Sequence, residues 1–337
     1  MHAEGVIGIA GPEDGATAYA ARRLRARGWT VVNWGLPTET PYAARPPPRA
    51  IVTASRDTAR AWRAAVPDLP IVLLADDDTT VGKDRNTVAL LTPFEVVVVH
   101  QILEARLRAP APPSFAKPRL RAARIRLGAD VLDAPFGGVP RGHAFTVSGP
   151  SGAGKTLLAI QYLAHGERGL LLSDRSPAET ASYAHALHLP LSEAIESGAL
   201  IVLEYRDFLL PPPPATDVPP AGFAQFVEIV QSNHVRRAAL DTGLPWLTAS
   251  GPPDAVRAAS FVRALEHTGA TVLLTLPGSS GETAPRLAAV VAAEIRLCVD
   301  AHRRRTATIR DAVGGPAETP IPFVIEPGIG IRPPRGR

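Results

Sequence analysis

The sequence contains very little cysteine, methionine or aromatic side chain. Its 337 residues include 1 Cys and 1 Met, and aromatic residues make up 5%. A single cysteine, Cys298, excludes an intramolecular disulfide framework and is typical of a reducing compartment. Because Cys298 stands in an apolar stretch, we expect it to be a small buried side chain.

Long hydrophobic runs are also absent. No stretch approaches the roughly 20 apolar residues that a membrane helix needs. The first residues, MHAEGVIGIAGPEDG, lack the basic region, apolar core and cleavage site of a signal peptide. We therefore expect a cytoplasmic protein without a membrane segment.

The chain has no large excess of charge of one sign. Its formal net charge is +4 at pH 7, from 36 Lys and Arg against 32 Asp and Glu, and the arginines are spread along the sequence. The basic stretches KPRLRAARIR (117–126) and HRRR (302–305) carry no aromatic pattern for base stacking, so we expect solvated or interface surfaces there. Nucleic acid is not an expected partner.

The length and the pattern of apolar runs predict two α/β domains. A chain of 337 residues with 45% hydrophobic content is long and apolar enough to form two domains, each with its own core. Short apolar runs alternate with helical stretches over residues 1–108 and again from about 122 to 333, which indicates parallel sheets covered on both faces. The proline-rich APAPPSFAKP (109–118) is typical of a semi-rigid spacer. We predict a domain over 1–108, a linker over 109–121 and a second domain over 122–337.

The stretch SGPSGAGKTLLA (148–159) follows a predicted strand and opens a predicted helix, which is the context of a phosphate-binding loop. Glycines let main-chain amides turn toward phosphate oxygens, and the helix N-terminus adds a positive dipole end. Lys155 supplies a charge for the β and γ phosphates, and the Thr156 hydroxyl is the expected Mg²⁺ ligand. The residues predicted to bind ATP are Gly149, Pro150, Ser151, Gly152, Ala153, Gly154, Lys155 and Thr156.

A second acidic position completes the predicted metal site. The run RRAALDT places Asp241 directly after an apolar stretch, as expected for a carboxylate that anchors Mg²⁺ at the end of a neighbouring strand. ATP and Mg²⁺ are therefore the predicted cofactors.

The second domain resembles the KaiC-type members of the RecA-like ATPases. The resemblance begins with RIRLGADVLDAPFGGVPRGHAFTVSGPSGAGKT, which joins a Leu132–Asp133 pair and a turn over residues 137–142 to the phosphate loop. It continues through the ALDT segment to the tail IPFVIEPGIGI and covers roughly residues 122–333. This resemblance implies a homo-oligomeric ring, usually a hexamer, with ATP between subunits.

Two departures from the family pattern concern catalysis. Members usually carry paired glutamates where this chain has Asp174 and Arg175, so Asp174 is the candidate catalytic base and hydrolysis is expected to be slow or absent. Glu204, at the end of the next strand, is the alternative base. The trans-acting basic motif retains Arg310 and has Thr308 where a lysine is expected, which leaves Arg310 as the candidate contact to a neighbour's γ-phosphate.

The first domain resembles a response-regulator receiver, a flavodoxin-like doubly wound fold. PDLPIVLLADDD is similar to that family's fourth strand and LLTPFEVVVVHQILEAR to its fifth strand and last helix. The position of the phosphoacceptor aspartate holds only Thr53, Ala54 and Ser55; Thr92 replaces the lysine before Pro93; and the acidic pair is displaced to Glu13 and Asp14. The resemblance therefore implies a pseudo-receiver that docks a signalling partner or its own ATPase ring.

Two other polar groupings are expected to be surface features. The three carboxylates Asp76, Asp77 and Asp78 read as a solvated loop. His185 and His188 lie close together on a helix, but a metal site would need a third ligand that the pattern does not supply.

These features predict an ATP-binding signalling protein that hydrolyses ATP slowly and whose assembly depends on nucleotide. One alternative is a DNA-dependent ATPase like the RecA/RadA recombinases, because the same fold hosts strand-exchange motors. Another is a nucleotide-bound scaffold without hydrolysis. The tail PPRGR holds no Ser or Thr, so we predict no autokinase activity there.

Overall fold

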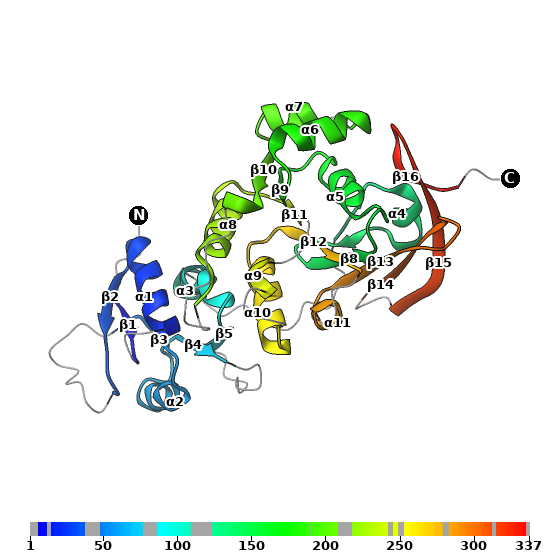
Figure 1. The fold of residues 1–337 in the computed structure, drawn as a ribbon. Helices are drawn as coiled ribbons and strands as arrows, with labels where there is room; N and C mark the ends of the chain where they lie inside the picture. Colours follow the sequence, from blue (N-terminus) through cyan, green and yellow to red (C-terminus); the bar gives the residue numbers. More distant parts are fainter. Residues whose placement is uncertain are drawn as a thin grey trace. The chain divides into compact units, whose positions relative to one another are not determined.

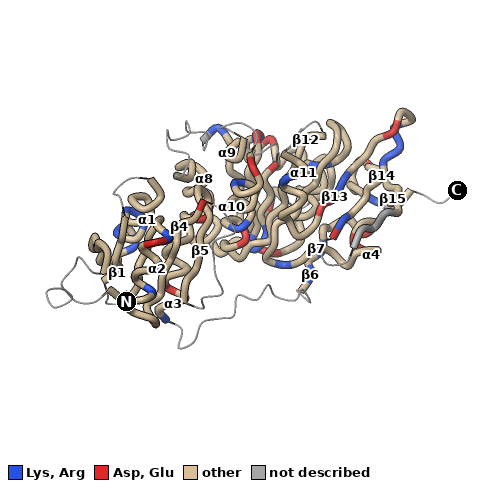
Figure 2. The backbone as a smooth tube through the Cα atoms, turned by 90° about the horizontal axis from the view of Figure 1, so that it is seen from below, with Lys and Arg blue, Asp and Glu red and all other residues tan. Residues whose placement is uncertain are grey.

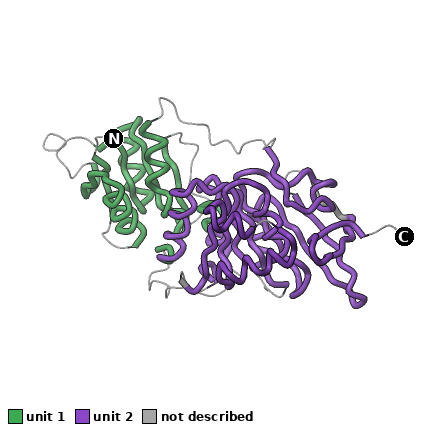
Figure 3. The backbone as a smooth tube through the Cα atoms, turned by 90° about the horizontal axis from the view of Figure 1, so that it is seen from above, with its two compact units in different colours: residues 1–116, 213–220, 259–264 green, residues 117–212, 221–258, 265–337 purple. Residues whose placement is uncertain are grey.

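The computed structural model describes residues 6–11, 15–37, 48–76, 86–108, 123–189, 191–207, 218–241, 245–248, 253–278, 283–311 and 315–334. The chain divides into two compact units, shown in Figure 3. Unit 1 comprises Met1–Ala116, Pro213–Pro220 and Ala259–Ala264, and unit 2 comprises Lys117–Pro212, Ala221–Ala258 and Leu265–Arg337. The predicted linker, residues 109–121, lies outside the described residues, so its role as a domain boundary stays a prediction.

Unit 1 is built on a parallel five-stranded sheet with the order β2-β1-β3-β4-β5. This is the strand order of the flavodoxin-like doubly wound fold. Its strands are β1 (Val6–Ile9), β2 (Thr30–Asn33), β3 (Ala50–Thr53), β4 (Ile71–Ala75) and β5 (Thr87–Leu91).

Helices cover both faces of that sheet. On one face, the apolar sides of α1 (Gly15–Ala26) and α3 (Val99–Arg108) share one core with the sheet. Separate from that core, Trp62 of α2 (Arg56–Ala65) is fully buried and meets Trp34 edge to face, with 5.9 Å between ring centroids. A 3₁₀ turn, η3 (Glu95–Val98), precedes α3. The last helix that the resemblance of LLTPFEVVVVHQILEAR implied is therefore present.

Unit 2 contains a nine-stranded sheet in the order β10-β9-β11-β12-β8-β13-β14-β15-β16 (Figure 1). The first six strands in this order, β10, β9, β11, β12, β8 and β13, run parallel. The pairs β13–β14, β14–β15 and β15–β16 are antiparallel. Together with the phosphate loop after β8, this mixed sheet is the RecA-like fold predicted from the sequence. The strands are β8 (Ala144–Gly149), β9 (Gly169–Ser173), β10 (Leu200–Glu204), β11 (Arg237–Leu240), β12 (Thr271–Pro277), β13 (Ala293–Val299), β14 (Arg305–Asp311), β15 (Gly315–Glu326) and β16 (Gly330–Arg332).

Helix α5 is the most deeply buried helix of this unit. Its residues from Leu157 to Leu163 are all buried, and they pack on the strands at the centre of the sheet. Helix α5 spans Lys155–Leu163, and α10 (Ala255–Glu266) is divided between the two units. The remaining elements are α4 (Asp130–Phe136), α6 (Pro177–Ala186), α7 (Leu191–Glu196), η4 (Tyr205–Asp207), α8 (Ala221–Ser232), α9 (Pro245–Thr248), α11 (Thr283–Ala288) and the two-stranded pair β6 (Arg124–Ile125) and β7 (Val139–Pro140).

Two buried polar side chains hold the first and last segments of unit 2 in place. Asp133 accepts hydrogen bonds from the backbone amides of Leu127 and Gly128, at 2.7 and 3.0 Å. Gln161 of α5 donates to the Gly128 carbonyl at 3.3 Å and accepts from the Ile331 amide at 3.0 Å. One side chain of α5 therefore bonds to the segment before the sheet and to its last strand.

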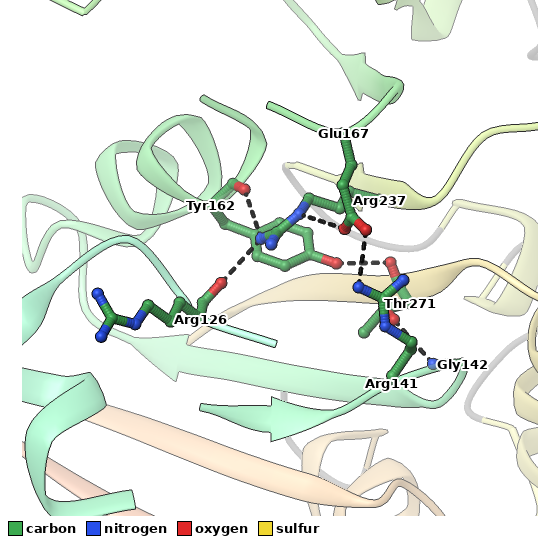
Figure 4. A network of polar contacts seen from close by, with 7 residues as sticks. All are labelled: Arg126, Arg141, Gly142, Tyr162, Glu167, Arg237 and Thr271. Atoms are coloured by element: carbon green, nitrogen blue, oxygen red, sulfur yellow. Dashed lines mark hydrogen bonds and ion pairs between the residues drawn. The ribbon is translucent and has the colours of Figure 1, made fainter. Parts of the chain in front are cut away.

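An arginine at the start of β11 occupies the centre of a buried polar network (Figure 4). Arg237 is 5% exposed. It pairs with Glu167 at 3.0 Å and donates to the carbonyl oxygens of Arg126 and Tyr162, at 2.8 and 3.0 Å. Its guanidinium also lies 5.0 Å from the centre of the Tyr162 ring. These contacts satisfy a charge that burial alone would make costly.

Charged residues of both signs occur along both units (Figure 2), in line with the small net charge. Among the described residues, no helix has the length and apolar character to cross a membrane.

Candidate functional site

The predicted phosphate loop connects β8 to α5 and is shaped by glycines. Gly149 has φ of 154°, and a Cβ at this position would lie 2.5 Å from the Leu297 carbonyl oxygen. Gly152 and Gly154 also have positive φ, at 74° and 108°, and Gly154 is the N-cap of α5. Side chains would strain this backbone, so the glycines permit the turn that brings main-chain amides to the start of α5.

Lys155 folds back over the loop. Its Nζ donates to the carbonyl oxygens of Gly149 and Pro150, at 2.8 and 3.0 Å. Burial lowers the pKa of Lys155, and the negative charge of Asp241 partly opposes that shift. An anion in the loop would offer the ammonium group a stronger partner than two carbonyl oxygens.

Asp241 follows β11 and is 1% exposed. Its backbone amide donates to the Leu172 carbonyl at 2.8 Å, and its Oδ1 accepts a hydrogen bond of 2.9 Å from the Thr275 hydroxyl. Since β8, β11 and β12 are parallel, their carboxyl ends lie at one edge of the sheet. The predicted place of Asp241 directly after a strand is confirmed, and its role as a Mg²⁺ ligand stays a prediction. Thr275 was missed, because nothing in the sequence states that β12 lies beside β11.

The candidate catalytic base lies at the same edge. Asp174 follows β9 and is exposed, and its Oδ1 accepts from the Ser173 hydroxyl at 3.3 Å. The neighbouring Arg175 stacks over the Tyr183 ring, with 4.7 Å between guanidinium carbon and ring centroid. Glu204, the alternative, forms an ion pair with Arg206. Asp174 therefore carries no ion pair among the described residues, whereas the Glu204 carboxylate is engaged.

A tyrosine that the sequence did not single out is close to both acidic positions. Tyr205 is buried in η4, and its ring lies 6.0 Å from that of Trp246. Burial raises the pKa of Tyr205, and the charges of Asp241 and Asp174 raise it further. Tyr205 therefore stays a neutral phenol beside the two carboxylates.

Arg305 is a second residue that the sequence analysis did not assign to the site. It begins β14, and its guanidinium donates to the carbonyl of Gly152 in the phosphate loop at 3.4 Å. Its Nε is buried and has no hydrogen-bond partner among the described residues. The stretch HRRR was the available signal, but three consecutive arginines do not indicate which one faces the loop.

Arg310 lies on the opposite face of β14 from the core residues Ala307 and Ile309. It is exposed on β14, opposite Glu294 of β13, and lines a cavity together with residues 148–150. A contact between Arg310 and the γ-phosphate of a neighbouring copy stays a prediction.

The expectation for Cys298 is wrong. Cys298 is exposed, because side chains of a strand alternate between its faces. On β13 the neighbours Leu297 and Ile295 point into the core, which places Cys298 on the opposite face. An apolar stretch did not reveal this alternation.

The polar residues of unit 1 at the positions where a receiver carries its phosphorylation site make structural contacts. Thr53 is fully buried at the end of β3, and Ser55 is the N-cap of α2, accepting from the Thr58 amide at 3.2 Å. Thr92 donates to the carboxylate of Asp76 at 3.0 Å. Glu13, Asp14, Asp77 and Asp78 lie outside the described residues.

The other metal candidates remain without support. Within the part of the chain that the structure describes, no group of three or more His, Cys, Asp or Glu side chains is arranged to hold a metal ion. His185 lies in the last turn of α6, and His188 follows that helix with φ of 51°.

Comparison with known proteins agrees with this geometry. A family model described as "ATPase: KaiC" matches residues 125–331. Two relatives named "Circadian clock oscillator protein KaiC", from Picosynechococcus sp. and Rippkaea orientalis, are 40% and 39% identical over 74 residues, which is 20% of this chain and 14% of each relative. The protein of that name from Synechococcus elongatus is 29% identical over 157 residues, covering 42% of this chain and 29% of the relative. The matched segments therefore span less than a third of each relative.

Proposed function

The chain belongs to the KaiC family of ATPases, and from this premise we propose that unit 2 binds ATP with Mg²⁺ at the loop of residues 149–156. The observation that carries the proposal is the loop itself. Three glycines in positive-φ conformations turn its backbone, and an added Cβ at Gly152 would meet nothing within 4 Å. The backbone at Gly152 is therefore open, and Lys155 lies over the loop.

The residues around the loop fit a magnesium ion as well. Thr156 opens the first turn of α5, and Asp241 supplies a buried carboxylate oriented by Thr275. Mg²⁺ prefers such oxygen ligands together with phosphate oxygens. When bound, the ion would neutralise charge on the β and γ phosphates.

Nucleotide affinity tests this proposal directly. Replacing Lys155 by Ala should weaken ATP binding by at least about tenfold, the equivalent of one charge-assisted hydrogen bond. The matched control is Lys117→Ala, which removes the same charge outside the loop. Calorimetry with Mg·ATP that gave equal affinities for both variants would reject the proposal.

We further propose that hydrolysis is slow, with Asp174 as the base. A carboxylate of Asp is one methylene shorter than the glutamate of the family pattern, and the stacked Arg175 offers no base. Asp174→Asn should therefore lower phosphate release while ATP affinity is retained. Glu204→Gln is the control, since Glu204 is paired with Arg206. Phosphate release at the same trace level in wild type and Asp174→Asn would favour a scaffold without hydrolysis.

Assembly completes the proposal. Arg310 lies on the face of β14 away from its own α5, so a γ-phosphate that it contacts would belong to another copy in a homo-oligomeric ring, which we propose to be a hexamer. Light scattering with and without Mg·ATP tests this, and Arg310→Gln should reduce turnover without reducing the mass of the assembly. A monomeric mass under both conditions would reject the ring.

Unit 1 is proposed to act as a pseudo-receiver in a cytoplasmic signalling protein. Its strand order is that of the doubly wound fold, and Thr53 and Ser55 stand where a phosphoacceptor aspartate is needed. Incubation with acetyl phosphate should leave the mass of the protein unchanged. Acid-labile phosphate on unit 1 would contradict this role.

A further inference from the structure

Unit 1 contains one helical segment that comes from far along the chain. Residues Ala259–Ala264 belong to this compact unit, although they form the middle of α10. Both ends of α10 and the strand β12 that follows it belong to unit 2. One continuous helix therefore has its middle turns in unit 1 and its ends in unit 2.

The Ser260 hydroxyl holds this segment at the corner of unit 1 where β5 ends. It accepts hydrogen bonds from the backbone amides of Phe94 and Glu95, at 3.0 and 3.1 Å. It donates to the Leu91 carbonyl at 2.8 Å. All four residues are 0% exposed. A hydroxyl has one proton and two lone pairs, so these three bonds use its full capacity. Removing it would take an acceptor from two buried amides, which is costly.

A charge pair and a ring pair fix the same corner. The fully buried Glu95 pairs through Oε1 with Arg263 at 3.2 Å, which offsets the cost of burying the carboxylate. Ser260 and Arg263 are three residues apart and so lie on one face of α10. The Phe261 ring meets that of Phe94 edge to face, with 5.1 Å between centroids. The corner therefore binds a hydroxyl, an aromatic ring and a guanidinium from one stretch of helix.

The end of α10 is tied to the large sheet of unit 2. Glu266, the last residue of the helix, accepts from the backbone amide of Ala144 at 3.1 Å, and Ala144 begins β8. The turn after α10 is closed by Thr268, whose hydroxyl donates to the Leu265 carbonyl at 2.6 Å and accepts from the Ala270 amide at 3.2 Å. This short, hydrogen-bonded turn leads directly into β12.

Strand β12 carries Thr275, the residue whose hydroxyl orients Asp241. We propose that unit 1 regulates the Mg·ATP site of unit 2 through α10, by holding the helix in the position from which β12 presents Thr275 to Asp241. The inference rests on the proposed function, because it names a regulator for the same site. It requires no phosphorylation of unit 1, so it gives a receiver-like domain without an acceptor aspartate a way to act.

Thermodynamic linkage makes this proposal testable from both ends. If the contact of unit 1 with its α10 segment favours Mg·ATP binding by some factor, Mg·ATP favours that contact by the same factor. Couplings of this kind typically amount to about fivefold or more. Weakening the contact should therefore weaken Mg·ATP binding, and Mg·ATP should strengthen the contact.

The first measurement is calorimetry with Mg·ATP on the full chain. Ser260→Ala should raise Kd for Mg·ATP by about fivefold or more, and Kd for ATP in EDTA should change much less, because the route ends at a metal ligand. The matched control is Ser55→Ala, which removes a hydroxyl that caps α2 in the same unit and should bind like wild type. If Ser260→Ala does not fold, Glu95→Gln replaces it, since this variant removes only the charge that faces Arg263.

The second measurement is hydrogen exchange of the wild-type protein. Mg·ATP should slow exchange of the amides of Phe94 and Glu95, the two donors to Ser260, by about the same factor. The slowing must exceed that of the α2 amides, which report general stabilisation of unit 1. Lys155→Ala should show no slowing.

Both results are required, because the linkage is reciprocal. If wild type binds Mg·ATP while Ser260→Ala and Ser55→Ala have equal affinities, or if exchange at Phe94 and Glu95 does not respond to Mg·ATP, the regulation by unit 1 is rejected and the proposed ATP binding stands. A wild-type protein that does not bind Mg·ATP rejects the proposed function, and this inference with it.

Discussion

The Thr275 hydroxyl donates a 2.9 Å hydrogen bond to Oδ1 of Asp241, and both side chains are 1% exposed. A buried hydroxyl in this position fixes one oxygen of the carboxylate and so determines where the other one points. The orientation of the proposed magnesium ligand therefore depends on a residue of the neighbouring strand.

We predict that Thr275→Val lowers the affinity for Mg·ATP by about tenfold, since a hydrogen bond to a charged group contributes roughly 1.5–3 kcal/mol. ATP binding in EDTA should change much less, because it does not use the metal ligand. Thr275→Ser keeps the hydroxyl and should restore Mg²⁺ dependence. The measurement is calorimetry with and without Mg²⁺.

The matched control for that variant is Thr146→Val on β8. Thr146 is fully buried, and its hydroxyl has no hydrogen-bond partner among the described residues. Its replacement by Val should be neutral or stabilising and should leave Mg²⁺ dependence intact. Equal losses in Thr146→Val and Thr275→Val would show that the effect is general to the core.

Arg237→Met should destabilise unit 2 by about 2–4 kcal/mol, because it leaves two carbonyl oxygens and one side of Glu167 without a donor. Arg141 still pairs with Glu167 at 2.7 Å, so the carboxylate is not left alone. Urea unfolding gives the loss, and Arg236→Met, on the exposed neighbour, should change stability by less than about 0.5 kcal/mol. Equal stabilities of the two variants would contradict the role of the network.

Gly149→Ala should abolish nucleotide binding and lower stability by more than Gly166→Ala does. Both glycines have positive φ, a conformation that costs an alanine roughly 1–3 kcal/mol. Only at Gly149 would the added Cβ also collide with a backbone oxygen, whereas at Gly166 it would meet nothing within 4 Å. Thermal unfolding and ATP titration of the two variants distinguish the cost of backbone strain, which both variants carry, from the cost of the steric clash, which only Gly149→Ala carries.

The free energy of unfolding should fall as pH rises past neutrality, because the His143–Glu266 ion pair is lost when His143 releases its proton. His143 Nδ1 lies 3.2 Å from Glu266 Oε1, and this hydrogen bond raises the pKa of His143 above 6.5, with burial opposing the shift. A raised pKa in the folded state gives stabilisation that is complete below the unfolded pKa and is lost as pH rises through the folded one.

The expected size of this pH effect is up to about 1 kcal/mol, because the pair is partly exposed. His143→Gln and Glu266→Gln should each remove it. Urea unfolding between pH 6 and about 8.5 provides the test. A wild-type stability that stayed level across this range, or that rose, would reject the assignment.

The sequence predicted those features that depend on neighbours along the chain. The loop of residues 149–156 is such a feature, because its glycines, lysine and flanking elements are contiguous. The position of Asp241 at the end of a strand was predicted as well, since a carboxylate after an apolar run is a local pattern. The resemblance to the KaiC-type ATPases predicted the RecA-like fold of unit 2 but not the order of its strands.

Features that depend on which strands lie side by side could not be predicted. Thr275 contacts Asp241 only because β12 pairs with β11. In the sequence, Arg237 is one of several polar residues that precede a strand. In the structure it forms hydrogen bonds with Arg126, Tyr162 and Glu167, which come from separate segments. Cys298 was placed in the core because hydrophobic content was considered without the alternation of β13.

The amide of Gln161 has a consequence for the boundaries of the catalytic domain. It accepts from Ile331 and donates to Gly128, so a fragment that stopped before β16 would leave a buried oxygen of the nucleotide-loop helix without its donor, at a cost of about 1–3 kcal/mol. The last strand, β16, is thus part of the ATPase fold. A partner that displaced β16 would destabilise the helix from which Lys155 and Thr156 project.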